Sequence, residues 1–561
     1  MISMSEPLIS GPVLYCGILL SSILFLRRLL SKLSTQKLPL PPGPKGLPIL
    51  GNISDLPPVG VPEWRHWLKY KDEYGPICSV TVLGQTIIVI HDKDMASELL
   101  DKRSAKFSSR PFMEFASRIC GYEKTLGLRE HNDEVRTQRK LAARQLGSKN
   151  LMAKYYSAIE FQVQRFLFRT MNDSDGLVDH LQLILMNALL THADWGLYSE
   201  AGSFILNNVY GYKTNPNGRD PLIALINQFM AEFSAAVVAG AWPVDIFTWI
   251  RYLPEWVPGV KFQAIARGYR KNLADATNIP FDFVERKRAE VQCPESVSRS
   301  YVSNLLDGLD SNPNPVDLDN IKESALSLYA GGADTTVASL GYFFLAMTLF
   351  PEVQRKAQEE IDGVVGCSRL PGFEDRENLP YVEAVLKETW RWMPIASLCL
   401  PHTSNEEDEF RGYRIPKGSI ILPSIAWFAR DPKTYSDPEQ FKPERFLGPQ
   451  AEEELDPQKF AFGFGRRICP GRYSADANMF LMIAQSLAVF DIQKKIDPAT
   501  GKEIEPVVGQ VPGIVSHPAP FECSITPRSA THRQLIEEVR VAYAKEEAEG
   551  GDDRFLHGLS S

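Results

Sequence analysis

Close cysteine pairs are missing from this chain of 561 residues. Its eight cysteines stand at positions 16, 78, 120, 293, 367, 399, 469 and 523, and no two form a Cys-x-x-Cys motif. This spacing argues against a disulfide framework and a cysteine-rich zinc site, and it fits a reducing compartment. A basic excess is missing too, because the formal net charge is -8. The sequence therefore gives no support to nucleic-acid binding.

Long apolar runs are also scarce, and the one that stands out begins at Leu8 and ends at Leu26. It carries no charge, and as a helix it would reach roughly 28 Å, close to the hydrocarbon thickness of a bilayer. Basic residues follow it at Arg27 and Arg28, whereas a cleaved signal peptide carries them before a shorter apolar core. We therefore expect residues 1–26 to be a single-pass membrane anchor, with the remaining chain in the cytosol.

Composition divides the rest of the chain into three segments. Residues 27–52 form a basic and proline-rich linker, because the prolines in Leu38–Asn52 deny the backbone helical hydrogen bonds. Residues 53–528 are expected to fold as one large body. Residues 529–561 form a charged tail at the surface, with a helix near Arg533–Glu549.

Local patterns predict several elements of the body. Ile77–Ile90 is typical of a β-hairpin with Gly84-Gln85 at the turn, and Asp92 suits the N-cap of a following helix. The stretch Phe233–Gly259 is rich in aromatic residues and proline. It fits a packed core and an exposed apolar surface about equally well.

Asp317–Phe350 is predicted to be one long helix, capped by Asp317 or Asp319 and ended by Pro351. Its middle, Gly331 to Thr336, reads Gly-Gly-Ala-Asp-Thr-Thr, which is a poor helix sequence because each glycine costs about 1 kcal/mol relative to alanine. Such a conflict indicates a groove in which the backbone approaches a flat ligand and a hydroxyl faces it.

The segment Phe462 to Gly471 (Phe-Gly-Phe-Gly-Arg-Arg-Ile-Cys-Pro-Gly) is the most informative in the chain. Its glycines allow a tight turn around the Cys469 sulfur, and a thiolate bound to iron needs amide donors nearby. Arg466 and Arg467 add positive charge that would favour a thiolate and meet acidic groups of a cofactor.

This segment resembles the haem-binding signature of the cytochrome P450 family, which is met by Phe462, Gly465, Arg467, Cys469 and Gly471. Three further motifs resemble that family. They are Gly331 to Thr336, the Glu388-x-x-Arg391 pair and the Pro-Glu-Arg-Phe element at residues 443–446. Pro401-His402 and the anchor are similar as well. The resemblance implies a mainly α fold with small β-sheets, preceded by one transmembrane helix.

The resemblance also implies roles for these residues. Cys469 would be the axial ligand of the iron of haem b (iron protoporphyrin IX), and Thr335 with Asp334 would supply protons beside the oxygen site. Phe462, Gly465, Gly471 and His402 would complete the haem site, and Glu388, Arg391 and Arg445 would lock the loop behind it. One departure stands out. The family often has Trp-x-x-x-Arg in an early helix, where this chain has Val135 and Arg139. Arg139 keeps the charge for a haem propionate, but Val135 cannot donate a hydrogen bond.

The chain lacks a flavin or nicotinamide fingerprint, so electrons must come from a partner. Lys459, Arg466, Arg467 and Arg472 form a positive run without acids. Some of these residues serve the haem or plain solvation, and the remainder could meet an acidic partner surface. The resemblance implies a membrane-bound NADPH cytochrome P450 reductase and a place in the endoplasmic reticulum membrane, with the catalytic domain facing the cytosol.

The substrate is predicted by analogy to be a lipophilic small molecule that is oxidised with O2. The analogous pocket residues are apolar: Phe112, Phe115, Ile395, Leu398, Ile514 and Val515. The chain is most similar to fungal secondary-metabolism members, which act on compounds such as terpenoids and polyketides. Two alternatives stay open, a haem-thiolate isomerase or dehydratase and a non-catalytic membrane haem-binding protein. The presence of both Asp334 and Thr335 favours oxygen activation over the isomerase or dehydratase, and a non-catalytic protein would leave the costly glycines at 331 and 332 unexplained.

Overall fold

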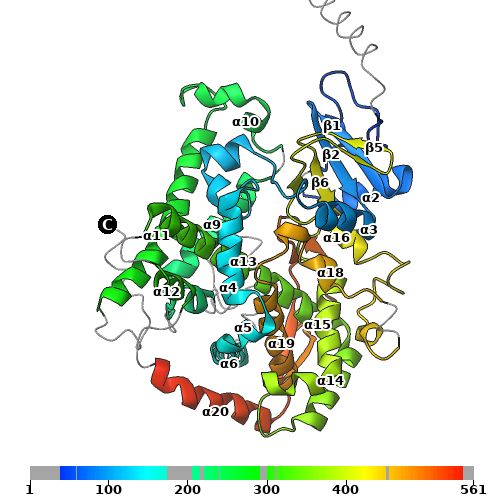
Figure 1. Ribbon diagram of the computed structural model, residues 1–561. Coiled ribbons are helices and arrows are strands. Elements are labelled where there is room, and N and C mark those ends of the chain that lie inside the picture. The colour runs from blue at the N-terminus through cyan, green and yellow to red at the C-terminus, as the bar shows by residue number, and fades with distance from the viewer. Residues whose placement is uncertain are drawn as a thin grey trace, which may run out of the picture.

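Helices pack around one long central helix, and the largest of the small sheets lies at one side (Figure 1). The computed structural model describes residues 38–58, 60–172, 205–214, 220–238, 240–290, 300–309, 313–449 and 454–547. The predicted anchor at residues 1–26 lies outside this described part. The helices are α2 (Glu63–Tyr74), α3 (Lys93–Ser97), α4 (Asp133–Leu146), α5 (Lys149–Met152), α6 (Tyr156–Asn172), α9 (Pro221–Ala236), α10 (Pro243–Ile246), α11 (Phe262–Glu290), α12 (Tyr301–Leu306), α13 (Pro315–Leu349), α14 (Pro351–Val364), α15 (Pro380–Trp392), α16 (Ile425–Phe428), α18 (Gln458–Ala461), α19 (Arg472–Val489) and α20 (Ala530–Glu547).

The strands are short and fall into four small sheets. The largest sheet has the order β1-β2-β6-β3, and the other three are the pairs β10-β7, β4-β5 and β8-β9. Their bounds are β1 (Ile77–Val82), β2 (Gln85–Ile90), β3 (His402–Thr403), β4 (Asp408–Phe410), β5 (Tyr413–Ile415), β6 (Ile420–Pro423), β7 (Phe490–Lys494), β8 (Gln510–Val511), β9 (His517–Pro518) and β10 (Cys523–Pro527). The expectation of a mainly α fold with small sheets is confirmed.

The predicted hairpin is present, but its turn lies one residue earlier than expected. Val82 pairs with Gln85, so Leu83 and Gly84 form the two-residue turn. Both have positive φ angles, 49° and 89°. A tight turn of this kind matches the twist of the flanking strands, and Gly84 adopts the required angle without strain. The prediction placed Gln85 in the turn because glycine alone does not fix the register.

Helix α13 crosses the molecule from Pro315 to Leu349 and is 35 residues long, which corresponds to about 50 Å. Its N-cap is Asn314, whose side chain accepts a hydrogen bond from the Val316 amide at 3.0 Å. The prediction of Asp317 or Asp319 as the cap was wrong, because Pro315 suits the first helical position and moves the start upstream. Pro351 opens α14 as expected, at a bend of 102°.

The C-terminal helix α20 is part of the packed body in its first half. It begins at Ala530, earlier than predicted, and contacts α6 and α19. Ile536 is 1% exposed within the main hydrophobic core, so this part of the predicted surface tail is buried. Ile536 is buried because it is apolar. A single apolar residue of this kind is hard to recognise within a charge-rich sequence.

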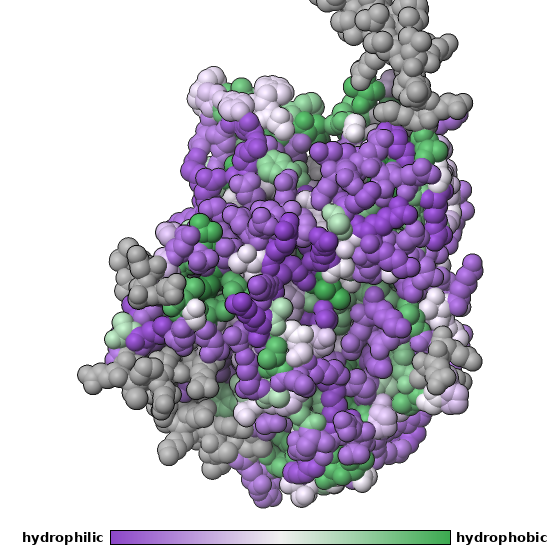
Figure 2. Space-filling model, in the orientation of Figure 1, coloured by the Kyte–Doolittle hydropathy of each residue, from purple (hydrophilic) through white to green (hydrophobic). Residues whose placement is uncertain are grey.

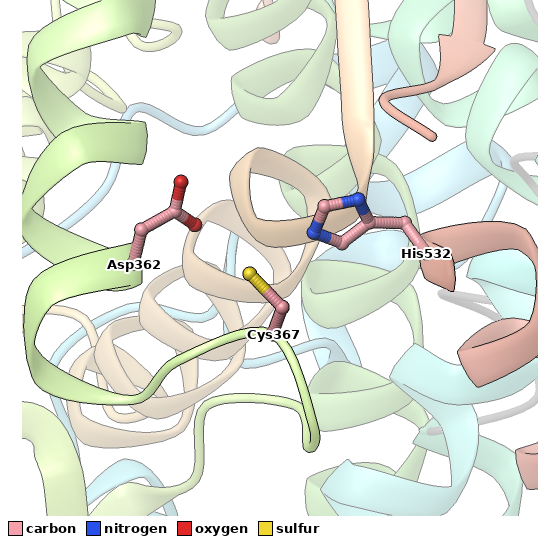
Figure 3. A group of neighbouring side chains, drawn as sticks. All are labelled: Asp362, Cys367 and His532. Carbon is pink, nitrogen blue, oxygen red and sulfur yellow. The ribbon is translucent and has the colours of Figure 1, made fainter. Parts of the chain in front are cut away.

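Helix α20 also brings His532 close to Asp362 and Cys367, whose ligand atoms lie within 4.8 Å of one another (Figure 3). The arrangement could suit a metal ion by residue type alone. However, Arg528 already binds both oxygens of Asp362, at 2.6 and 2.9 Å. The His532 Nδ1 atom is engaged with the Ser529 hydroxyl at 2.9 Å. A guanidinium therefore neutralises the carboxylate, and the group is better explained as an ion pair that fastens α14 to the chain after β10.

The aromatic stretch between α9 and α11 serves both of the uses that the sequence left open. Trp242 stacks on Phe115 with ring centroids 3.7 Å apart, whereas Trp249, Tyr252 and Trp256 are 61%, 74% and 82% exposed. Figure 2 shows the end that bears α10 mostly in pale purple and white, with a few green patches of apolar residues beside it. Among the described residues no single helix is long and apolar enough to cross a membrane. Helices α13 and α14 together have the length and composition, but they form a sharply bent pair.

Candidate active site

At its middle, helix α13 borders an open space that its other residues do not contact. Residues on either side of it are buried, but Gly331 is exposed and a methyl group added to it would meet nothing within 4 Å. Gly332 faces the other way, where an added methyl would lie 2.5 Å from the Ile205 side chain. The two glycines thus have different causes. Gly332 is required by packing, and Gly331 borders an open space on the side of Thr335, which we call the groove.

The predicted catalytic pair lies at this groove. The Thr335 hydroxyl donates to the Gly331 carbonyl at 2.6 Å, which satisfies it within the helix. Asp334 points to β9, where His517 Nε2 lies 3.1 Å from its Oδ1 atom. Sequence reasoning missed His517, because β9 is separated from α13 by more than 150 residues and no motif includes it.

The loop around Cys469 is held tightly by its backbone. The Cys469 amide donates to the Phe462 carbonyl at 2.8 Å, and the Gly471 amide reaches the sulfur. Gly465 has a φ of +51°, and an added methyl would lie 2.1 Å from the Leu100 carbonyl oxygen. Gly465 is therefore fixed by close backbone packing. Burial raises the pKa of the Cys469 thiol, while the Gly471 amide, Arg139 and Arg472 act to lower it.

Four cationic or imidazole side chains gather beside this loop, and we call them the arginine–histidine group: Arg110, Arg139, His402 and Arg467. Arg467 donates to the carbonyls of Ser108, Leu126 and Arg129 at 2.7, 3.1 and 2.6 Å. Arg139 donates to the Ile468 carbonyl at 2.6 Å, and Arg110 to those of Leu400 and Pro401 at 2.7 and 2.8 Å.

No member of the arginine–histidine group forms an ion pair with a carboxylate in the part of the chain that the structure describes. Burial lowers the pKa of Arg467 to about 9, of Arg110 to about 10 and of His402 to about 3. The Nε atom of Arg110 and the Nε2 atom of His402 are buried and have no partner among the described residues. Buried charges are normally paired, so this group suits an anionic ligand.

The residues present therefore fit haem b. Its two propionate carboxylates are opposite in charge to the guanidiniums of the arginine–histidine group, and Arg110 Nε and His402 Nε2 have no other partner among the described residues. The groove at Gly331 leaves room for a flat ring, and Cys469 offers sulfur as the iron ligand. Arg110 was not predicted, because one arginine followed by proline carries no distinctive pattern. It supplies a donor in a site where Val135 is fully buried and has none.

The charge run Lys459 to Arg472 divides between the site and the surface. Arg467, which was expected to bind the cofactor, is 7% exposed and points inward. Lys459 and Arg466 are exposed, and Arg472 is partly so. Helix α4 adds Lys140 and Arg144 as exposed cations, and Arg139 of the same helix contacts the Cys469 loop. A basic surface therefore remains, with different members.

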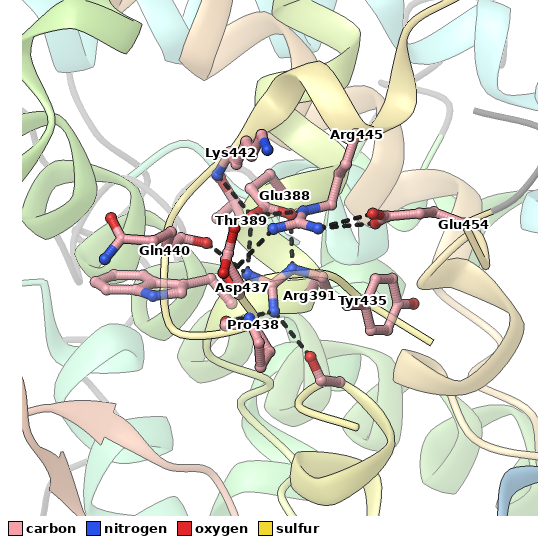
Figure 4. Close-up of polar contacts among 12 residues, drawn as sticks. Glu388, Thr389, Arg391, Tyr435, Asp437, Pro438, Gln440, Lys442, Arg445 and Glu454 are labelled. Carbon is pink, nitrogen blue, oxygen red and sulfur yellow. Dashed lines mark hydrogen bonds and ion pairs between the residues drawn. The ribbon is translucent and has the colours of Figure 1, made fainter. Parts of the chain in front are cut away.

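The Glu388-x-x-Arg391 pair and the Pro-Glu-Arg-Phe element meet in a second buried cluster, the arginine–glutamate group of Glu388, Arg391 and Arg445 (Figure 4). Glu388 accepts from Arg391 at 2.7 and 2.8 Å and from Arg445 at 3.2 Å. The Lys442 amide donates to it at 2.8 Å. Arg391 also donates to three carbonyls, and Arg445 binds Glu454 at 2.9 Å. The three members are at most 1% exposed.

The predicted pocket residues are only partly brought together. Phe115 is fully buried in the core and stacks on Trp242, and its place in the pocket stays a prediction. Phe112 is 45% exposed and lies beneath the Arg118 guanidinium at the surface. Leu398 packs in the core beside α2. Ile395 accepts a hydrogen bond from the Ser516 amide at 2.7 Å, which joins it to the segment that carries Ile514 and Val515.

The fold and the site together define a haem-binding oxidoreductase. The chain belongs to the cytochrome P450 family, whose family model, "Cytochrome P450", matches residues 41–524. It is 44% identical to cytochrome P450 monooxygenase claR of Ampulloclitocybe clavipes, over 89% of this chain and 88% of that protein. It is 42% identical to multifunctional cytochrome P450 monooxygenase af510 of Aspergillus fumigatus, over 89% and 90%. It is 36% identical to O-methylsterigmatocystin oxidoreductase of Aspergillus flavus, over 97% and 98%.

The protein is thus a haem-thiolate monooxygenase. It binds haem b and uses O2, a redox partner that supplies electrons, and a lipophilic substrate. The prediction of the enzyme class and the cofactor is confirmed, and a non-catalytic haem-binding protein is excluded.

Proposed function

We propose that this enzyme is anchored in the endoplasmic reticulum membrane and oxidises a lipophilic secondary metabolite with electrons from a membrane-bound NADPH cytochrome P450 reductase. The single observation that carries the proposal is the group of exposed aromatic residues at one end of the molecule, Trp249, Tyr252 and Trp256. Large aromatics with polar tips are favoured where an apolar phase meets water.

A second exposed apolar segment supports this membrane-facing end. Ile49 is 86% exposed and Leu47 is 53% exposed, in the chain that leads into the body from the predicted anchor. In Figure 1 this segment and α10 both lie at the upper end of the molecule. An anchor and two apolar contacts would hold the body in one orientation on the bilayer surface.

In the site itself, we propose that Cys469 holds the iron of haem b and that the arginine–histidine group holds its propionates. The cofactor, when bound, supplies the chemistry that activates O2. Asp334 and Thr335 of the chain would deliver protons beside it. Because the Thr335 proton is directed to the Gly331 carbonyl, its oxygen is left to accept a hydrogen bond from the groove.

We place the reductase at the basic surface formed by Lys459, Arg466 and Arg472 with Lys140 and Arg144 of α4. Opposite charges across an interface speed productive encounter more than they raise affinity. This surface adjoins the Cys469 loop, because Arg139 of α4 donates to the Ile468 carbonyl. Electrons would therefore enter on the side of the cysteine.

For the substrate, the name of O-methylsterigmatocystin oxidoreductase gives the most informative guide. We propose a lipophilic secondary metabolite of the terpenoid or polyketide class, admitted at the groove beside Gly331. Exposed aromatics at the membrane-facing end would suit a compound that arrives from the lipid phase.

The membrane orientation can be tested with the full chain reconstituted in vesicles that contain brominated lipid. Replacement of Trp249 and Trp256 with Tyr should remove a large part of the tryptophan fluorescence that the lipid quenches. The matched control is Trp392→Phe, since Trp392 is 2% exposed. Equal loss of quenchable fluorescence in both variants would contradict the proposed orientation.

A further inference from the structure

The carboxylate of Asp334 has a partner from a distant part of the chain. His517 lies in β9, which packs against α13, and its Nε2 atom is 3.1 Å from Asp334 Oδ1. The two side chains are 11% and 15% exposed. An ion pair or charged hydrogen bond at such burial is held much more firmly than one on an open surface.

The imidazole is placed by a backbone that is fixed on several sides. Val511 of β8 pairs with His517. The neighbouring Ser516 donates through its amide to the Ile395 carbonyl at 2.7 Å and through its hydroxyl to the Val511 carbonyl at 3.1 Å. Gln510 accepts from the Trp64 indole at 2.8 Å. The β8-β9 hairpin therefore holds the His517 ring in a fixed position against α13. The contact with Asp334 is more restricted than one made by a mobile surface side chain.

The unequal environments of the two ring nitrogens assign the donor. Nδ1 is buried and has no hydrogen-bond partner among the described residues. A buried N–H group without an acceptor is unfavourable. A buried ring nitrogen that carries no hydrogen costs less free energy when it has no partner. The arrangement therefore favours the tautomer with hydrogen on Nε2, which donates to the carboxylate of Asp334.

We propose that His517 is a positioning residue that holds the Asp334 carboxylate at the groove by a hydrogen bond from Nε2, and thereby sets the route by which protons reach Thr335. The inference rests on the proton-delivering role proposed above for Asp334. Asp334 and Thr335 are successive residues on a helix, so their side chains diverge by about 100°. A carboxylate that serves the threonine must be aimed, and His517 is a fixed donor that can aim it.

Two substitutions distinguish the effect of losing the hydrogen bond from the effect of losing the imidazole ring. His517→Ala removes the donor, whereas His517→Gln retains an N–H near the position of Nε2. The matched control is His532→Gln, because His532 and His517 are each 8% exposed as whole residues, but His532 lies beside Asp362 and Cys367 and not beside Asp334. A loss caused by general disturbance of a buried histidine would appear in the control as well.

The test uses the haem-loaded full chain with a cytochrome P450 reductase, and follows NADPH oxidation in H2O and D2O without an organic substrate. His517→Ala should slow it about tenfold and raise the solvent isotope effect, a smaller loss than removal of a proton-transferring group gives. His517→Gln should stay within about twofold of the wild type. A purely structural clamp would leave the isotope effect unchanged.

Thermal melting gives a second readout that does not depend on turnover. The decreases in Tm for His517→Ala and Asp334→Ala should sum to more than the decrease in the double variant, since both break one contact. Additive decreases, or an unchanged isotope effect in His517→Ala beside a changed one in Asp334→Ala, would overturn the inference. If Asp334→Ala itself changed neither rate nor isotope effect, the proposed role of Asp334 would fail first.

Discussion

The two buried arginine groups differ in what balances their charge. In the arginine–glutamate group, the Glu388 carboxylate lies between two guanidiniums, and Glu454 binds Arg445 from the other side. In the arginine–histidine group, every described hydrogen bond of a guanidinium goes to a backbone carbonyl. One group is complete within the chain, and the other has the composition of an anion site.

This difference separates a structural role from a binding role. A cluster whose charges cancel internally stabilises the fold whether or not a ligand is bound. A cluster of buried cations without an acid gains most when an anion arrives. The same residue type, arginine, thus serves both purposes, and the acid beside it decides which.

The largest expected effect is on the complete group. Glu388→Ala leaves Arg391 and Arg445 buried without their shared carboxylate, which should cost about 3–5 kcal/mol in the free energy of unfolding. Urea unfolding of the purified protein measures it. Glu359→Gln is the control, because it pairs with Arg355 at the surface, where both side chains are 61% exposed, and should cost about 1 kcal/mol or less. Similar losses in both variants would remove the distinction.

The next effect concerns the anion site. Arg110→Met keeps much of the buried stem but removes the donors, and we expect haem to pass to apomyoglobin about 10 to 100 times faster. Arg430→Met is the matched control. Arg430 is also buried, but it donates to the Trp392 carbonyl and pairs with Glu439. A rate of haem loss that rises equally in the control would mean that Arg110 acts through packing alone.

A pH effect should follow from His402. Burial lowers the pKa of His402 from 6.5 to about 3. Below pH 6.5 the unfolded chain therefore binds a proton on this imidazole that the folded chain does not bind. Stability is therefore lost as the pH falls from 6.5 towards 3, by about 1 kcal/mol per pH unit. His402→Gln should flatten this dependence, as measured by urea unfolding at several pH values. Other groups supply the slope that remains, among them His91, whose pKa is lowered to about 4. An unchanged slope in His402→Gln would show that this imidazole is not kept neutral.

The smallest effect is expected at the surface. Lys459→Glu with Arg466→Glu should slow reductase-driven turnover about tenfold at low salt and less at high salt, because surface charges act mainly on encounter rates. Stopped-flow measurement of the first electron transfer checks it. Lys502→Glu, at an exposed lysine elsewhere, should have little effect. Equal slowing by all three changes would contradict a localised docking surface.

Much of the fold and of the site could be predicted from local sequence. The cysteine loop, the central helix with its two glycines and the Glu388-x-x-Arg391 pair are compact motifs whose spacing is set by a turn or a helix. The structure brings Glu388, Arg391 and Arg445 together, as their motifs imply. These sites could be predicted because each motif lies within a short stretch of sequence.

What could not be predicted depends on tertiary packing. Arg110 and His517 lie in short segments without periodicity, and their roles arise only when the chain brings them to Arg467 and Asp334. The stacking of Phe115 on Trp242 was not predicted for the same reason, since an aromatic residue in a loop gives no sign of its packing partner. The helix start at Pro315 was missed because several residues nearby could serve as a cap.

The central claim is that Cys469 holds the haem iron as a thiolate. It is tested most directly by the difference spectrum of the reduced protein with carbon monoxide, recorded beside Cys469→Ala. The account predicts a Soret band at the position typical of thiolate ligation in the wild type and its loss in the variant. A wild-type band typical of histidine ligation in folded, haem-loaded protein, or a thiolate band that persists in Cys469→Ala, would contradict it.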